Sequence, residues 1–146
     1  MSIRSVSERI ADTRAKLESE VDLWVASASA SGEAYLLPLS YYWDGVTLTM
    51  ATPATTRTAR NLRRAGWARL GLGPTRDVVI IEGPVVEIAA DADDALAEAH
   101  ARAAGFEARR SPGYVFFQLR PQRILAWRNP AEAEAGPIML NGEWLA

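Results

Sequence analysis

The sequence of 146 residues contains no cysteine, a single histidine (His100) and a single lysine (Lys16). The absence of cysteine excludes a disulfide framework, a catalytic thiol and every thiolate metal site. One histidine is too few for a His-rich zinc site, and we expect no metal. We expect His100 to be exposed on a helix of small residues, which argues against a hydrolase triad. The side chains are therefore poorly equipped to catalyse a reaction unaided.

Long hydrophobic runs are also missing. The longest apolar stretch, residues 34–39, is far shorter than the ~20 residues of a membrane helix. Residues 1–20 mix charged with isolated apolar residues and lack the apolar core of a signal peptide, so we expect a cytoplasmic protein without a membrane partner. A net charge of −2 and a pI near 5.5 argue against a dedicated nucleic-acid partner.

Hydrophobic residues make up 49% of the chain, which is enough to form the core of one domain. The predicted domain spans residues 1–146, with an N-terminal helix (1–20), a barrel (21–128) and a C-terminal tail (129–146) whose residues 130–137 we expect to be loop-like. Strands are predicted at 21–29, 35–43, 46–50, 67–72, 78–88, 114–119 and 123–127. Two further helices are predicted, one capped by Thr55 or Thr56 and running to about residue 65, the other capped by Asp91 or Asp93 and running to residue 104. Asp44-Gly45 marks a hairpin, and Gly83-Pro84 marks a bulge or bend. This order predicts a mainly β protein, a closed or partly closed barrel with peripheral helices.

The segment from Thr52 to Arg64 combines threonine hydroxyls with four arginines at the start of a predicted helix. A helix N-terminus favours anions, and guanidinium groups bind phosphate bidentately. Arg57 and Arg60 are three residues apart and share a face, whereas Arg63 points elsewhere. Taken alone, the segment is equally well explained as a solvated basic face. The strands that precede it provide a surface on which a flat ring can lie.

The chain resembles the pyridoxamine 5'-phosphate oxidase-like split-barrel family over about residues 8–128. The residues that carry the resemblance are Leu37-Pro38-Leu39-Ser40, Trp43-Asp44-Gly45, the pattern T-x-x-x-x-R-x-A-R-N-L-R-R that begins at Thr52, and a later strand with Glu82-Gly83. The resemblance implies a six-stranded antiparallel Greek-key split barrel. It also implies a homodimer with two sites for FMN or the deazaflavin coenzyme F-420 at the dimer interface.

Cofactor-binding residues follow from the same resemblance. It implies that the phosphate is surrounded by Thr52, Thr56, Arg57 and Arg60, and that the ring lies along Pro38, Leu39, Ser40, Met50, Ala51 and Thr52. Thr58 and Asn61 belong to the expected set, and Trp127 and Arg128 would reach the partner subunit's site. Many relatives have lysine where Thr58 stands, so one phosphate charge is missing here: either Arg60 compensates, or the cofactor binds more weakly. The C-terminus does not clearly show the tryptophan-arginine substrate pattern of the true oxidase, which argues against pyridoxamine phosphate as the substrate.

These observations favour a flavin-dependent oxidoreductase that binds FMN and a small-molecule substrate. A flavin carries hydride chemistry itself and needs binding, orientation and electrostatics from the protein. No catalytic residue is assigned, and Tyr41, Tyr42 or water are the candidate proton donors. The alternatives are a coenzyme F-420-dependent reductase, a protein that binds or sequesters a flavin without turnover, and a small barrel that binds single-stranded nucleic acid through arginines and aromatics.

Overall fold

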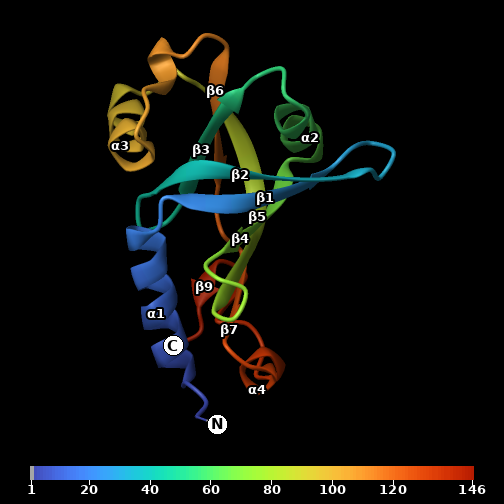
Figure 1. The fold of residues 1–146 in the computed structure, drawn as a ribbon, viewed down its shortest axis with the longest axis vertical. Coiled ribbons are helices and arrows are strands. Elements are labelled where there is room, and N and C mark those ends of the chain that lie inside the picture. Colours follow the sequence, from blue (N-terminus) through green and yellow to red (C-terminus); the bar gives the residue numbers. More distant parts are fainter. Residues whose placement is uncertain (1) are drawn as a thin grey trace.

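The computed structural model describes residues 2–146 (Figure 1). Its elements in chain order are α1 (Val6–Ser19), β1 (Asp22–Ala28), β2 (Ala34–Trp43), β3 (Leu48–Pro53), α2 (Arg57–Ala65), β4 (Trp67–Leu72), β5 (Val78–Ala89), α3 (Asp94–Ala104), the 3-10 helix η1 (Ala108–Arg110), β6 (Tyr114–Leu119), β7 (Arg123–Trp127), α4 (Pro130–Glu134), β8 (Met139–Leu140) and β9 (Glu143–Trp144). Up to β7, the predicted order of helices and strands is confirmed, except that the short helix η1 is not predicted.

Six strands close into a barrel. They pair in the ring β1-β2-β3-β6-β5-β4, and β4 closes it because it pairs with both β1 and β5. Every pairing in the ring is antiparallel. Strands β7, β8 and β9 continue outward from β5. The prediction of a mainly β, six-stranded antiparallel barrel with peripheral helices is therefore confirmed.

The hairpin between β2 and β3 is held by one carboxylate. Asp44 Oδ1 accepts hydrogen bonds from the amides of Val46 (2.8 Å) and Thr47 (2.6 Å), and Asp44 Oδ2 accepts one from the Thr47 hydroxyl (2.7 Å). Because these bonds hold residues 44–47 as a loop, β3 begins at Leu48 and not at Val46 as the alternation predicts.

The long strand β5 changes partners at Gly83. Residues 78–82 pair with β7, and residues 85–89 pair with β6. At the crossing, the backbone of the β6–β7 turn comes very close: a Cβ at Gly83 would lie 2.1 Å from the carbonyl oxygen of Arg120. The Arg120 amide donates to the Pro84 carbonyl (3.2 Å), and the Gln122 amide donates to the Glu82 carbonyl (2.9 Å). Glycine is required here for close approach, which confirms the predicted bend.

Replacing Gly83 tests this crossing. We expect Gly83→Ala to lower the free energy of unfolding by about 2 kcal/mol or more, because the backbone of Arg120 must move away. The matched control is Gly71→Ala in β4, where the nearest atoms to a new Cβ lie at 3.8 and 3.9 Å. Urea unfolding of both variants measures the difference, and equal midpoints would contradict this account.

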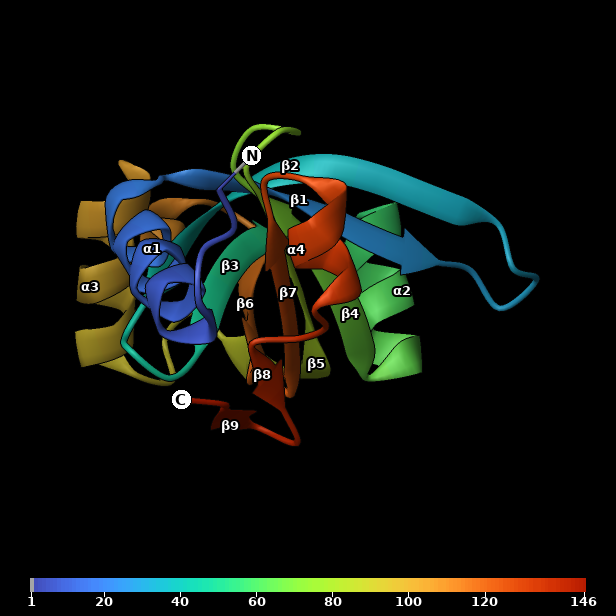
Figure 2. The same ribbon diagram turned by 90° about the horizontal axis from the view of Figure 1, so that it is seen from below.

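Buried side chains form two clusters, one inside the barrel and one outside it. Inward-facing residues such as Val25, Leu48, Ile81 and Phe117 form the barrel core. Helix α1 packs against it at one end through Ile10 and Leu17, and the Tyr41 hydroxyl donates to the Leu17 carbonyl (2.8 Å). Seen from that end, α1 and α4 lie in front of the strands (Figure 2). A second cluster, which includes Ala51, Ala97 and Phe116, joins α3 to the outer face of β3 and β6.

A buried ion pair joins the N-terminus to α4. Arg4 donates to Glu132 through Nη2 (2.7 Å) and Nε (3.1 Å), and the backbone amides of Arg4 and Arg128 also donate to this carboxylate. The hydrogen bond from the Arg4 side chain is the main cause that lowers the pKa of Glu132 to about 2. The prediction of a loop over residues 130–137 is wrong, because Asn129 caps a helix at Pro130–Glu134 by accepting from the Glu132 amide (3.0 Å).

In residues 2–146, no helix is long and apolar enough to cross a membrane.

Candidate functional site

A cavity of about 320 Å³ opens where β2 parts from β3. The two strands pair only over Tyr41–Trp43 and Leu48–Met50. Beyond these residues β2 pairs with β1, and β3 pairs with β6. The strand cavity, as we call it, is lined by Asp22, Pro38, Leu39, Ser40, Ala51, Thr52, Pro53, Phe106 and Tyr114. The split between the strands thus gathers five of the six residues predicted to lie along the ring.

The start of α2 lies at the Thr52 end of the strand cavity. Thr56 caps the helix, since its hydroxyl accepts from the Ala59 amide (3.1 Å) and lies 3.2 Å from the Thr52 hydroxyl. The Thr56 hydroxyl also donates to the Pro53 carbonyl (3.0 Å). Both hydroxyls therefore fix the turn between β3 and α2. First-turn amides of a helix lack intrahelical partners, so this turn presents backbone donors and the positive end of the helix dipole.

The arginines of α2 differ in how their charge is compensated. Arg63 pairs with Glu87 on β5 (2.7 Å) and donates to the Ala54 carbonyl (3.2 Å), so a carboxylate compensates its charge. Arg57 lies over the ring of Tyr35, with Cζ 5.3 Å from the ring centroid, and Arg60 donates to the Thr55 carbonyl (2.8 Å). Neither has a carboxylate within 4.0 Å among the described residues. The helix start thus carries two uncompensated charges beside the strand cavity.

Four predicted cofactor contacts lie elsewhere in this subunit. The Thr58 side chain is fully buried, and its hydroxyl has no hydrogen-bond partner within residues 2–146. Met50 is fully buried in the barrel core. The side-chain amide of Asn61 donates to the Ser27 hydroxyl (3.1 Å) and so links α2 to β1. Trp127, in β7, lies opposite Val78 of β5 and is not part of the strand cavity. Because its side chain is buried, Thr58 can contact a ligand at the helix start only through its backbone.

Four lining residues are not among those predicted from the sequence: Asp22, Pro53, Phe106 and Tyr114. Asp22 lies opposite Ser40 and accepts a hydrogen bond from its hydroxyl (2.6 Å). Tyr114 lies opposite Pro53, and its ring packs edge-on against Phe106 at 5.6 Å. The pairing of β1 with β2, which are neighbours in the sequence, brings Asp22 to the cavity. The pairing of β3 with β6 brings Tyr114 and its neighbour Phe106 there. Because β3 and β6 are far apart in the sequence, no local pattern indicates these two residues.

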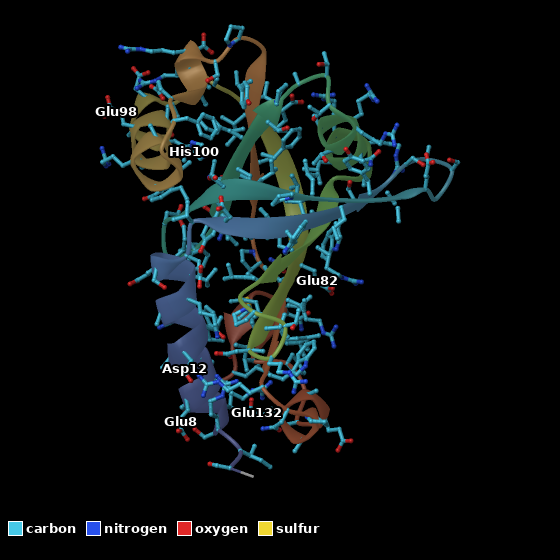
Figure 3. The ribbon with its side chains drawn as sticks, viewed as in Figure 1. Glu8, Asp12, Glu82, Glu98, His100 and Glu132 are labelled. Atoms are coloured by element: carbon cyan, nitrogen blue, oxygen red, sulfur yellow. The ribbon has the colours of Figure 1, made fainter. Side chains whose placement is uncertain are left out.

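The prediction that His100 is exposed is wrong, because the side chain is fully buried. His100 lies on the side of α3 that faces the strands, whereas Glu98 lies on the outer side (Figure 3). Its ring packs edge-on against Phe116 (5.1 Å) and Phe106 (5.4 Å). In the described part of the chain, neither ring nitrogen has a hydrogen-bond partner. Burial lowers the pKa of His100 below its ordinary 6.5. The small residues of α3 allow the helix to pack closely and do not mark a solvated face.

Acid should therefore weaken the packing of α3. Because the pKa of His100 is lower in the folded protein than the ordinary 6.5, the unfolded chain takes up the proton first as the pH falls. We expect the free energy of unfolding to fall below pH 6.5 by up to about 1.4 kcal/mol per pH unit. His100→Leu should remove this component between pH 7 and pH 5, a range above the titration of Glu132. Chemical unfolding across that range measures it, and an unchanged pH slope in the variant would contradict the assignment.

Comparison with known proteins places the chain in a family. The model of the pyridoxamine 5'-phosphate oxidase family matches residues 11–128. The chain belongs to this family. No curated protein sequence matches the chain.

Solved structures share the fold at low sequence identity. A candidate pyridoxamine 5'-phosphate oxidase from Listeria innocua is 17% identical with a TM-score of 0.67, covering 82% of this chain and 98% of that one. An F-420 reductase is 15% identical with a TM-score of 0.64, covering 76% and 94%. The heme storage protein HutZ from Vibrio cholerae is 11% identical with a TM-score of 0.65, covering 81% and 94%. These likenesses define a split-barrel fold whose named members differ in what they bind.

Proposed function

We propose that this protein binds FMN in the strand cavity and acts as a flavin-dependent oxidoreductase. The observation that carries the proposal is the continuity of the strand cavity with the start of α2. Thr52 lines the cavity, and its hydroxyl lies 3.2 Å from the hydroxyl of the N-cap Thr56. A flat ring in the cavity therefore places an attached phosphate near Arg57, Arg60 and the free amides of the first helical turn.

The residues present fit such a cofactor. When bound, a flavin supplies the hydride chemistry that the side chains of this chain lack. Arg57 and Arg60 bind the phosphate, and the backbone from Pro38 to Ser40 orients the ring. Phe106 and Tyr114 exclude water from one side of the cavity. The buried Thr58 adds no charge at the helix start, so phosphate binding depends on the two arginines.

A heme fits the described residues less well than a flavin. Heme iron is held by axial ligands such as histidine, cysteine thiolate, methionine or tyrosine. The chain has no cysteine, and its one histidine is buried among Phe106 and Phe116 under α3. Of these ligand types, Tyr114 is the one that lines the strand cavity. The second candidate is the deazaflavin coenzyme F-420, favoured by the structural likeness to an F-420 reductase. Coenzyme F-420 likewise combines a flat ring with a phosphate.

We further propose that the protein is a homodimer whose partner covers the outer face of β1, β2 and β4. This face carries Trp24 (51% exposed), Leu36 (60%) and Trp67 (45%), a group of large apolar side chains that is unusual on a monomer surface. Trp24 lies opposite Pro38, which also lines the strand cavity. A partner on this face therefore borders the cofactor, and its Trp127 is the predicted contribution to the site.

The first test is the spectrum of protein purified from a host that makes both cofactors. A two-band flavin spectrum supports FMN, and a single deazaflavin band supports coenzyme F-420. A colourless protein that neither cofactor reconstitutes contradicts the proposal. Turnover of the reduced cofactor with a panel of electron acceptors separates an enzyme from a protein that only stores the cofactor.

The phosphate site is tested by Arg57→Ala combined with Arg60→Ala. We expect cofactor affinity to fall at least roughly tenfold, which corresponds to about 1.4 kcal/mol. Arg76→Ala, an exposed arginine in the turn between β4 and β5, is the control and should bind as the unmodified protein does. Fluorescence titration measures the dissociation constants. Equal affinity of the double variant would mean that the arginines form only a solvated face.

The dimer is tested by placing a charge on the outer face. We expect Trp24→Glu to convert a dimer into a monomer and to weaken cofactor binding at the same time, because a buried unpaired carboxylate is costly. Val86→Glu, at an exposed position on the other half of β5, should remain dimeric. Sedimentation velocity reports the oligomeric state. A monomeric unmodified protein at tens of micromolar would overturn the dimer.

A further inference from the structure

A second cavity, of about 590 Å³, lies at the other end of β3. It is lined by residues of α1, the β2–β3 hairpin, the β6–β7 turn and the C-terminal β8–β9 hairpin, and we call it the tail cavity. Figure 1 shows β9 beside the lower half of the barrel, away from α2 and α3. The tail cavity shares no lining residue with the strand cavity. Its β8–β9 wall also lies beyond residues 11–128, which the family model matches.

The hairpin that forms this wall is fixed in place. Its turn is Asn141-Gly142, and both residues have positive φ (53° and 79°), as a two-residue type I′ turn requires. The Ile138 amide donates to the Ile124 carbonyl (2.8 Å), and the Gly142 amide donates to the Gln122 carbonyl (2.9 Å). Ile138 and Met139 are buried in the barrel core. The tail therefore presents a rigid surface to the cavity.

Two indoles and two arginines face this cavity. Trp43 comes from β2 and Trp144 from β9. The guanidinium of Arg14 lies over the Trp144 ring, with Cζ 4.7 Å from its centroid. A guanidinium stacked in this way is held by the ring and keeps its edge donors for an anion. Arg120 is positioned by the tight backbone crossing at Gly83.

The charges of the cavity favour a single anion. Of the residues from Ser2 onward, none places a carboxylate within 4.0 Å of the Arg14 or Arg120 guanidinium. Glu143 is the acidic residue among those that line the cavity, so the lining has a net charge of +1. The side-chain amides of Gln122 and Asn141 add hydrogen-bonding groups at the edge.

We propose that the tail cavity binds a small planar aromatic carboxylate, with its ring against Trp43 and Trp144 and its carboxylate on Arg14 and Arg120. The volume lies within the range of small-molecule sites, and aromatic walls with a few placed polar groups are typical of them. One carboxylate matches the net charge of the lining, whereas a neutral or cationic ring leaves the guanidinium groups without a partner. This binding is independent of the cofactor, because the two cavities share no residue.

The test measures binding of 2-naphthoate to the full chain by isothermal titration calorimetry, next to the neutral 2-naphthalenemethanol. We expect the carboxylate to bind at least tenfold more tightly than the alcohol. Arg14→Gln and Arg120→Gln should each weaken 2-naphthoate binding at least tenfold, and Arg110→Gln, an exposed arginine of η1, is the matched control. Because the side chains of Arg14 and Arg120 are exposed, both variants should fold, which circular dichroism checks.

Further variants locate the binding. Trp144→Leu should weaken binding of both probes, and the Arg57→Ala/Arg60→Ala variant should bind 2-naphthoate as the unmodified protein does. This last result separates the tail cavity from the proposed cofactor site, so either proposal can fail alone. Equal affinity for the carboxylate and the alcohol would overturn the proposal. So would unchanged 2-naphthoate binding in both arginine variants.

Discussion

The barrel depends on the crossing at Gly83, where the carbonyl of Arg120 comes closer to β5 than any side chain permits. Because β5 passes this point without a Cβ, it can pair with β7 before the crossing and with β6 after it, while β4 pairs with residues 79–84 across the crossing. This exchange of partners closes the six strands into a ring. It also places Arg120 at the mouth of the tail cavity, so one steric constraint sets both the closure and part of a binding surface.

Strand β2 also exchanges partners. It leaves β3 beyond Tyr41 and pairs with β1, which opens the strand cavity beside the start of α2. The chain has few side chains suited to catalysis, but it concentrates positive charge where β3 ends. An oxidoreductase that relies on a bound cofactor is consistent with this division, since binding and orientation are what the split strands and the arginines supply.

Features that depend on contacts between neighbouring residues follow from the sequence. The threonine cap of α2 and the Asp44-Gly45 hairpin depend on residues within a few positions of one another. The prediction for His100 fails because distant segments meet there. His100 was expected on the surface because α3 is rich in small residues, but these let the helix pack against Phe116 of β6. Helix α4, in contrast, has local signals in the sequence, because Asn129 caps it and Pro130 is its first residue.

The sequence by itself determined the mainly β class, the helix start that concentrates arginines, and the lack of side chains for unaided catalysis, since each follows from composition or short-range spacing. Only the tertiary structure decided which predicted contacts share a cavity. It gathered Pro38 to Ser40 with Ala51 and Thr52, added Phe106 and Tyr114, and buried Thr58 and Met50. It also turned the C-terminal tail into the wall of a second cavity. The physical reason is that strand pairing between distant segments, together with burial on a particular face, is fixed by closure of the whole barrel and not by neighbours in the chain.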